Sequence, residues 1–201
     1  MSKQGSIDLS NTNMWGHIKI QDTVSKEILV ESFNQIHYEN MSVAIAKSLA
    51  QQQSGFIQQM TFGNGGSLVS GTGAITYNPP NVQNVNAQLY NETYRKVINN
   101  QSPLDLDTNL NYIQINHLAG TTYSDLVTTC TLDYNEPAGQ EAFDTAGHLS
   151  GKYIFDELGL ITYDPNSTNG GLLLSHVIFN PVQKALNRQI EIVYTIRISM
   201  V

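Results

Sequence analysis

The sequence has few charged residues, one cysteine and one tryptophan. The shortage of charge and of cysteine excludes several classes of protein. Charged side chains make up 13% of the 201 residues, and ten Lys and Arg residues are scattered among 17 Asp and Glu residues, for a net charge of −7. Proteins that bind the nucleic-acid backbone have clustered basic residues, so we expect no nucleic-acid partner. A single cysteine, Cys130, excludes an internal disulfide.

Long apolar runs are also lacking. No stretch reaches the ~18 apolar residues of a membrane span. The first residues, MSKQGSIDLSNTN, lack the apolar segment of a signal peptide. We therefore expect no membrane partner, and a protein that is made and kept, or assembled, in a cytoplasm.

Amide side chains supply the polarity that charge does not. The chain has 20 Asn and 15 Gln residues, and these 35 amides outnumber the 27 charged side chains. Amides donate and accept hydrogen bonds without the desolvation penalty of a charge. This composition favours long loops and a surface that neighbouring subunits cover.

The apolar patterns predict a mainly β chain of the α+β class, organised as one domain. We expect residues 1–14 to be an arm, ordered only when a partner holds it. Residues 15–201 are predicted to form a single domain of the β-sandwich type, with an extended loop region over residues 64–109. Apolar residues at helical spacing predict one packed helix near residues 40–52, with Asn40 as its N-cap.

Alternation of apolar and polar residues is clearest in QIEIVYTIRIS, residues 189–199. Five apolar side chains, from Ile190 to Ile198, lie at every second position, which predicts a half-buried antiparallel strand. The stretch SDLVTTCTLDY alternates in the same way and places Cys130 on an apolar face, where its thiol would be buried and unreactive. Turn signals between such strands favour an antiparallel β-sandwich.

The uncharged stretch FGNGGSLVSGTG, residues 62–73, contains five glycines. A Walker loop needs a lysine directly after its last glycine, but no lysine lies between Lys47 and Lys96. A dinucleotide-binding loop needs a helix directly after it, which Pro79 and Pro80 prevent. We therefore expect this glycine loop to shape a turn or to lie against a neighbouring subunit, and we expect no cofactor.

One stretch has the spacing of a calcium ligand loop. Acidic and amide side chains alternate through residues 105–111, but Leu110 and Asn116 stand where such a loop needs glycine and glutamate. A solvated loop and a calcium site therefore both stay open here.

Other residues give no catalytic constellation. The five histidines are not spaced as metal ligands, and His176 alternates with apolar residues, as expected at the edge of a core. Asp156 and Glu157 are adjacent, so in a strand they should face opposite sides and form no acid–base pair. No Gly-x-Ser-x-Gly motif is present. The sequence thus predicts a protein that is not an enzyme.

Four stretches of the chain resemble virion structural proteins of tailed bacteriophages. They are ESFNQIHYENMSVAIAKSLA, FGNGGSLVSGTGAITYNPPN, QLYNETYRKV and the C-terminal FDELGL…LLLSHVIFNPVQKALNRQIEIVYTIRIS. The resemblance covers roughly residues 27–201, and the C-terminal stretch is similar to the endings of tail, collar and neck components. It implies a non-enzymatic subunit that is repeated by symmetry in a virion assembled in the host cytoplasm, and it carries over no functional residues.

Three functions follow as alternatives. The first is a structural subunit of the neck, collar or tail, with copies of itself and other virion proteins as partners. The second is a capsid decoration or cement protein, and the third is a receptor- or glycan-binding fibre domain, which clustered exposed aromatic residues would favour. The candidate interface and loop residues are Trp15, Gly63, Asn64, Gly65, Gly66, Gly71, Gly73, Pro79, Pro80, Tyr90 and Tyr94.

Overall fold

The computed structural model describes residues 11–137, 152–168 and 170–200. Its strands are β1 (Thr12–Asp22), β2 (Ile28–Ile36), β3 (Ile57–Gly63), β4 (Ser67–Val69), β5 (Ile75–Tyr77), β6 (Glu92–Val97), β7 (Tyr112–Asn116), β8 (Tyr123–Leu132), β9 (Lys152–Thr162), β10 (Leu173–Ala185) and β11 (Ile190–Met200). The helices are α1 (Tyr38–Leu49) and the short 3₁₀ helix η1 (Gln53–Gly55). The predicted mainly β, α+β class is confirmed.

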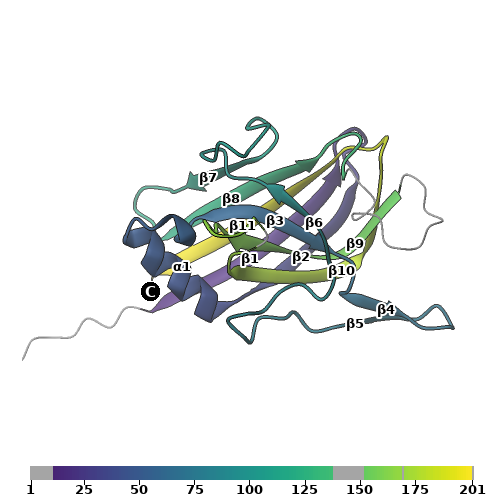
Figure 1. Ribbon diagram of the computed structural model, residues 1–201, viewed down its shortest axis with the longest axis horizontal. Coiled ribbons are helices and arrows are strands. Elements are labelled where there is room, and N and C mark those ends of the chain that lie inside the picture. Colours follow the sequence, from purple (N-terminus) through teal and green to yellow (C-terminus); the bar gives the residue numbers. More distant parts are fainter. Residues whose placement is uncertain (1–10, 138–151, 169, 201) are drawn as a thin grey trace, which may run out of the picture.

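Nine of the strands form one antiparallel sheet in the order β6-β3-β9-β10-β2-β1-β11-β8-β7. The sheet curls, so that its two halves face each other across a single hydrophobic core (Figure 1). The halves are joined at β2 and β10, where only two residue pairs, Ser175–Ile36 and His176–Gln35, connect the strands. The two layers expected of a sandwich therefore come from one sheet that bends at this junction.

The first and last strands of the chain, β1 and β11, lie side by side inside the sheet half β2-β1-β11-β8-β7. They pair from Thr12–Met200 to Asp22–Ile190 without a break in register. The alternation in β11 is confirmed, because Ile190, Ile192, Tyr194 and Ile196 are at most 2% exposed. At roughly 1.5–3 kcal/mol for each large apolar side chain removed from water, this strand stabilises the core strongly.

Helix α1 covers one end of the curled sheet (Figure 1) and buries a face that includes Met41 and Ala44. Its N-cap is His37, not Asn40 as the sequence predicts, because the His37 ring accepts the Asn40 backbone N–H through Nδ1 (3.2 Å). The Asn40 side chain instead donates to the Leu173 carbonyl oxygen (2.9 Å), which ties the helix to β10. The helix therefore spans Tyr38–Leu49 rather than residues 40–52.

Two other boundaries differ from the sequence-based prediction. Residues 12–14, assigned to the arm, already belong to β1, because they pair with the end of β11. Residues 1–10 lie outside the described residues. The region 64–109 contains three strands: β4 and β5 form a separate hairpin, and β6 is the edge strand beside β3, as the extended pattern of residues 87–98 suggests.

Candidate functional site

Two adjacent carboxylates of β9 bind the start of the glycine loop. Asp156 accepts the backbone N–H groups of Gly66 (2.9 Å) and Ser67 (2.8 Å), and also the Ser67 hydroxyl. Glu157 accepts the N–H of Gly65 (3.0 Å) through Oε1. The loop leaves β3 where Gly63 pairs with Glu157 in the middle of β9, and it presents successive amides to the two carboxylates.

Glu157 also binds a second segment of the chain. It accepts the N–H groups of Tyr90 (2.9 Å) and Asn91 (2.8 Å) and pairs with His176 Nε2 (3.0 Å). Both the Glu157 and the His176 side chains are fully buried. Burial raises the pKa of the Glu157 carboxyl, but His176 and the backbone amides outweigh it, so the pKa is lowered and the group stays ionised.

These contacts settle what the glycine loop can bind. A phosphate cradle works by presenting free backbone N–H groups to an anion. Here the N–H groups of residues 65–67 already donate to the chain's own carboxylates. An incoming phosphate would meet two negative charges in place of free donors, so this loop shapes the chain rather than binding phosphate.

The glycines differ in why they are needed. A Cβ atom on Gly65 would lie 2.7 Å from Asn91 N, and one on Gly63 would lie 2.5 Å from Asn91 O, so both positions require the absence of a side chain. Gly73 has φ = +83°, in the left-handed region that favours glycine. Gly71, in contrast, faces open space. Gly66 is intermediate, with its Cβ position 3.0 Å from Asp156 O.

The remaining predicted residues of this region fall in two places. Tyr90 is 44% exposed and its hydroxyl donates to the Pro79 carbonyl oxygen (2.7 Å), so Tyr90, Pro79 and half-buried Pro80 lie together on one surface. Asn64 bonds to Asn91 beside them. Tyr94 instead points into the core, where its ring lies 5.9 Å from that of Phe62 and burial raises its pKa.

The glycine loop ends in a hairpin that is exposed on most of its surface. Strands β4 and β5 form a two-stranded sheet separate from the main one, and they project from the body at one end (Figure 1). Leu68, Val69, Ile75 and Tyr77 of this hairpin are between 42% and 66% exposed. Residues 64–78 contain no charged side chain. Charge is one of the common devices that keep an exposed strand edge from pairing with another chain, and this hairpin lacks it.

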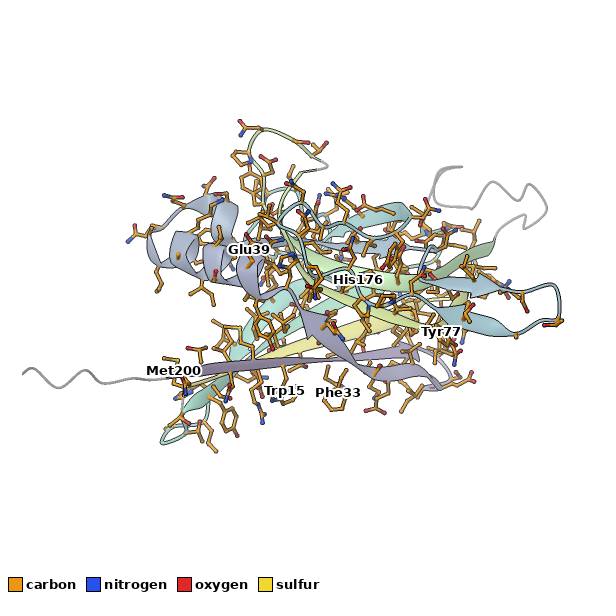
Figure 2. All side chains as sticks on the ribbon, turned by 90° about the horizontal axis from the view of Figure 1, so that it is seen from below. Trp15, Phe33, Glu39, Tyr77, His176 and Met200 are labelled. Atoms are coloured by element: carbon orange, nitrogen blue, oxygen red, sulfur yellow. The ribbon has the colours of Figure 1, made fainter. Side chains whose placement is uncertain are left out.

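A second exposed surface lies across four strands of the main sheet. Phe33 of β2, Trp15 of β1, Arg197 of β11 and Tyr123 of β8 form a row on the outer side of the sheet, which we call the aromatic face. The Trp15 and Phe33 rings meet edge to face with centroids 6.0 Å apart. Figure 2 shows both side chains pointing the same way, out of the sheet, where Phe33 is 71% and Trp15 is 40% exposed.

Arg197 holds the aromatic face together. Its guanidinium carbon lies 5.0 Å from the Trp15 ring centroid and 4.0 Å from that of Tyr123. The same group donates to both carboxylate oxygens of Asp125 (2.6 and 2.7 Å), which lowers the pKa of that carboxyl. Because Asp125 fixes the guanidinium plane, the Trp15 and Tyr123 rings that contact it are held in place in the single chain.

Sequence reasoning named Trp15 but missed the rest of this face. The sequence placed Trp15 at the start of the domain, next to the arm, and the structure places it within β1. Phe33 and Tyr123 are 18 and 108 residues away along the chain, so only the strand order brings them near. The one available signal was Phe33 at an outward position of an alternating strand.

Two lysines, Lys184 and Lys96, lie beside the acidic residues that follow β8, Asp133 and Glu136. Lys184 is fully buried and its Nζ donates to the carbonyl oxygens of Asp133 (2.8 Å), Glu136 (2.7 Å) and Ala185 (3.1 Å). Lys96 forms an ion pair with Glu136 nearby. Burial lowers the pKa of Lys184 to about 8. The ammonium groups thus fill the place that a cation would take.

The predicted calcium stretch is a series of turns in which side chains cap backbone groups. Asp105 accepts the Asp107 N–H (3.0 Å), and Asp107 accepts the Asn109 N–H (3.1 Å). Among the described residues, no group of three or more His, Cys, Asp or Glu side chains could hold a metal ion. The structure thus adds no support for calcium.

Two sequence-based expectations concern single features. Cys130 is fully buried on the inner side of β8, and burial raises the pKa of its thiol to about 12. Within the described parts of the chain, no helix is long and apolar enough to cross a membrane.

Comparison of the chain with known protein families, with characterised proteins and with solved structures gave no match.

Proposed function

We propose that this protein is a non-enzymatic structural subunit that assembles with copies of itself through the aromatic face. The observation that supports this most is the composition of that face. Trp, Tyr and Arg are the residue types that contribute most binding energy in protein interfaces. Here Arg197 contacts both the Trp15 and the Tyr123 rings on an outer sheet surface, and Phe33 lies beside Trp15.

Exposure of this face in a single chain is unfavourable. Phe33 is 71% exposed, and a large apolar ring gains roughly 1.5–3 kcal/mol when it is fully removed from water. The side chains are also held in place by packing and by Asp125, so little conformational entropy is lost on docking. A rigid apolar surface of this kind fits a neighbouring protein.

The setting that we propose is the particle of a tailed bacteriophage, in its neck, collar or tail. The support for this setting is the sequence resemblance over residues 27–201. The scarcity of charge and the abundance of amides fit a subunit that neighbours cover. A capsid decoration protein would use the same kind of contacts, and the number of copies in each particle separates the two: about a dozen for a neck ring, hundreds for decoration.

The single tryptophan makes this proposal testable without a label. Trp15 is the only tryptophan in the chain and lies on the proposed interface. As the concentration rises from about 0.1 µM to about 100 µM, we expect mass action to favour assembly, so that the sedimentation coefficient rises and Trp15 emission shifts to the blue together. Assembly without any change in Trp15 emission would place the interface elsewhere.

A matched pair of variants controls this experiment. Phe33→Ser removes an apolar ring from the aromatic face without touching the core, and we expect it to prevent both changes. Leu106→Ser alters a side chain that is 99% exposed on a distant loop, so it should assemble like the wild type. Equal behaviour of the two variants would contradict the proposal.

Glycan binding is a second candidate, because the aromatic face is the kind of cluster that favours it. Exposed aromatic rings with polar groups beside them also bind sugars, and Glu31 and Gln35 are exposed on either side of Phe33 in β2. A set of oligosaccharides that quenches Trp15 emission saturably, while the chain stays monomeric, would favour this function over assembly.

A further inference from the structure

Residues 78–91, which we call the strap, run from the hairpin to β6 and contain no charged residue. The strap packs Ala87 and Leu89 against Ile161 and Leu173 in a small second core. It forms no strand within the main sheet. Its backbone is instead bound by buried side chains, and three of these can titrate: His37, Glu157 and His176.

The structure assigns the strap an acid-sensitive attachment at His176, which releases the residues around Asn81 when its ring is protonated. At neutral pH the Asn81 backbone N–H donates to His176 Nδ1 (2.8 Å). Because Nδ1 accepts this bond, it has no proton, and the ring proton is on Nε2, which donates to Glu157 Oε2 (3.0 Å). The geometry therefore fixes a neutral ring in one tautomer.

Protonation of His176 changes only one of its two bonds. A proton on Nδ1 turns the acceptor for Asn81 into a donor, so two N–H groups then face each other and that bond is lost. The bond from Nε2–H to Glu157 stays and gains charge. Glu157 can still accept this bond, because the amides of Gly65, Tyr90 and Asn91 keep its carboxylate ionised.

The groups around the ring do not oppose this change. From β9 the ring faces Glu157, and from the strap it faces the neutral Tyr90 ring at 5.8 Å. The neighbouring residue on β2 is the uncharged Gln35. No positive side chain among the described residues forms a hydrogen bond or an ion pair with His176. Within the described parts of the chain, Glu157 is thus the one ionised side chain bonded to this ring.

The release is local, because the two ends of the strap are attached differently. Tyr90 and Asn91 stay bound to Glu157, whose carboxylate is unchanged. At the other end, Asn78 donates to the carbonyl oxygens of Gly65 and Gly66, which do not titrate. Residues 84–89 also stay attached, through His37 at Asn84, Asn40 at Val85 and the small core around Leu89. The part that opens is therefore residues 79–83. It would uncover the outer side of β10 around His176 without unfolding the core.

Hydrogen exchange followed by mass spectrometry tests this attachment. After correction for the intrinsic pH dependence of exchange, we expect the amides around Asn81 in the wild type to open more as the pH falls, by at most about tenfold for each pH unit, which is the slope of one proton taken up. The His176→Gln variant lacks the ring that holds Asn81, so the amides around Asn81 should show no such slope, although the His37 ring remains at Asn84. The His117→Gln variant changes an exposed histidine and should behave like the wild type.

A strap whose opening is independent of pH in the wild type would overturn the inference, and so would an unchanged slope in His176→Gln. If His176→Gln does not fold, ¹⁵N nuclear magnetic resonance of the wild-type histidine rings gives the answer. We expect His176 Nδ1 to become protonated in step with a shift of the Asn81 amide. An Nδ1 that stays unprotonated until the whole chain unfolds would contradict the proposed release.

Discussion

Ile196 and Arg197 are neighbours in β11 that point to opposite sides of the sheet, so two alanine substitutions separate folding from assembly. Ile196 is 2% exposed and lies between Gly16 of β1 and Leu126 of β8. Ile196→Ala removes buried carbon atoms and leaves a cavity that the glycine on one side cannot fill. We expect a loss of about 2–5 kcal/mol in the free energy of unfolding.

Arg197→Ala should have the opposite balance of effects. The substitution removes an ion pair with Asp125 and the stacking on Trp15 and Tyr123, all of them on the solvent side of the sheet, where water screens them, and it leaves no cavity in the core. The loss in unfolding free energy should therefore stay below that of Ile196→Ala. Assembly should weaken strongly, because the aromatic face loses the group that holds its rings.

Urea unfolding followed by circular dichroism measures the first effect, and sedimentation velocity at high concentration measures the second. A total stability of about 5–15 kcal/mol is typical of single domains, so the loss from Ile196→Ala is large enough to lower the unfolding midpoint clearly. A wild-type midpoint for Ile196→Ala would refute the inward position of this side chain. An Arg197→Ala variant that assembles normally would refute the role of the aromatic face.

Three further predictions concern single residues. Gly65→Val should destabilise the fold or prevent assembly, because its side chain meets the backbone of Asn91, whereas Gly71→Val should melt like the wild type in calorimetry. The pKa of Asp22 is held well below its ordinary value by the Ser25 N–H and by Arg188, so its contribution to stability is present above about pH 4 and is lost as the pH falls further; Asp22→Asn should flatten this dependence in urea titrations at several pH values. Cys130 should react with a thiol reagent at pH 8 only after unfolding, since its thiol is buried and has a pKa of about 12; fast labelling of the native chain would disprove this.

The sequence predicted those parts of the fold that depend on local pattern. The alternation of Ile190 to Ile196 and the burial of Cys130 follow from side chains two residues apart in a strand. The helix was found by its apolar face, but its start was misplaced. Asn is a better N-cap than His by intrinsic preference, yet the Asn40 side chain binds β10, so the helix begins one turn earlier at His37.

The attachments of the glycine loop and the strap could not be predicted in this way. Glu157 binds Gly65, which is 92 residues away along the chain, and His176 binds Asn81, which is 95 residues away. No periodic pattern marks such pairs, because they depend on which strands become neighbours. One chemical signal was present: Asp156 and Glu157 interrupt an otherwise apolar strand, and buried carboxylates need several donors.

The pairing of β1 with β11 determines when this chain can fold. The residue pair Thr12–Met200 is 188 positions apart, and it lies in the centre of one sheet half rather than at an edge. During synthesis at about 5–20 residues per second, β1 therefore waits roughly 10–40 s for its partner strand to be made. Throughout that time β1 and β2 have an apolar side without cover, and folding is expected to be slow because its contacts are distant in sequence. A ribosome-bound chain that stops before residue 190 should remain sensitive to protease, and a cell that makes many copies must keep such chains from pairing with one another.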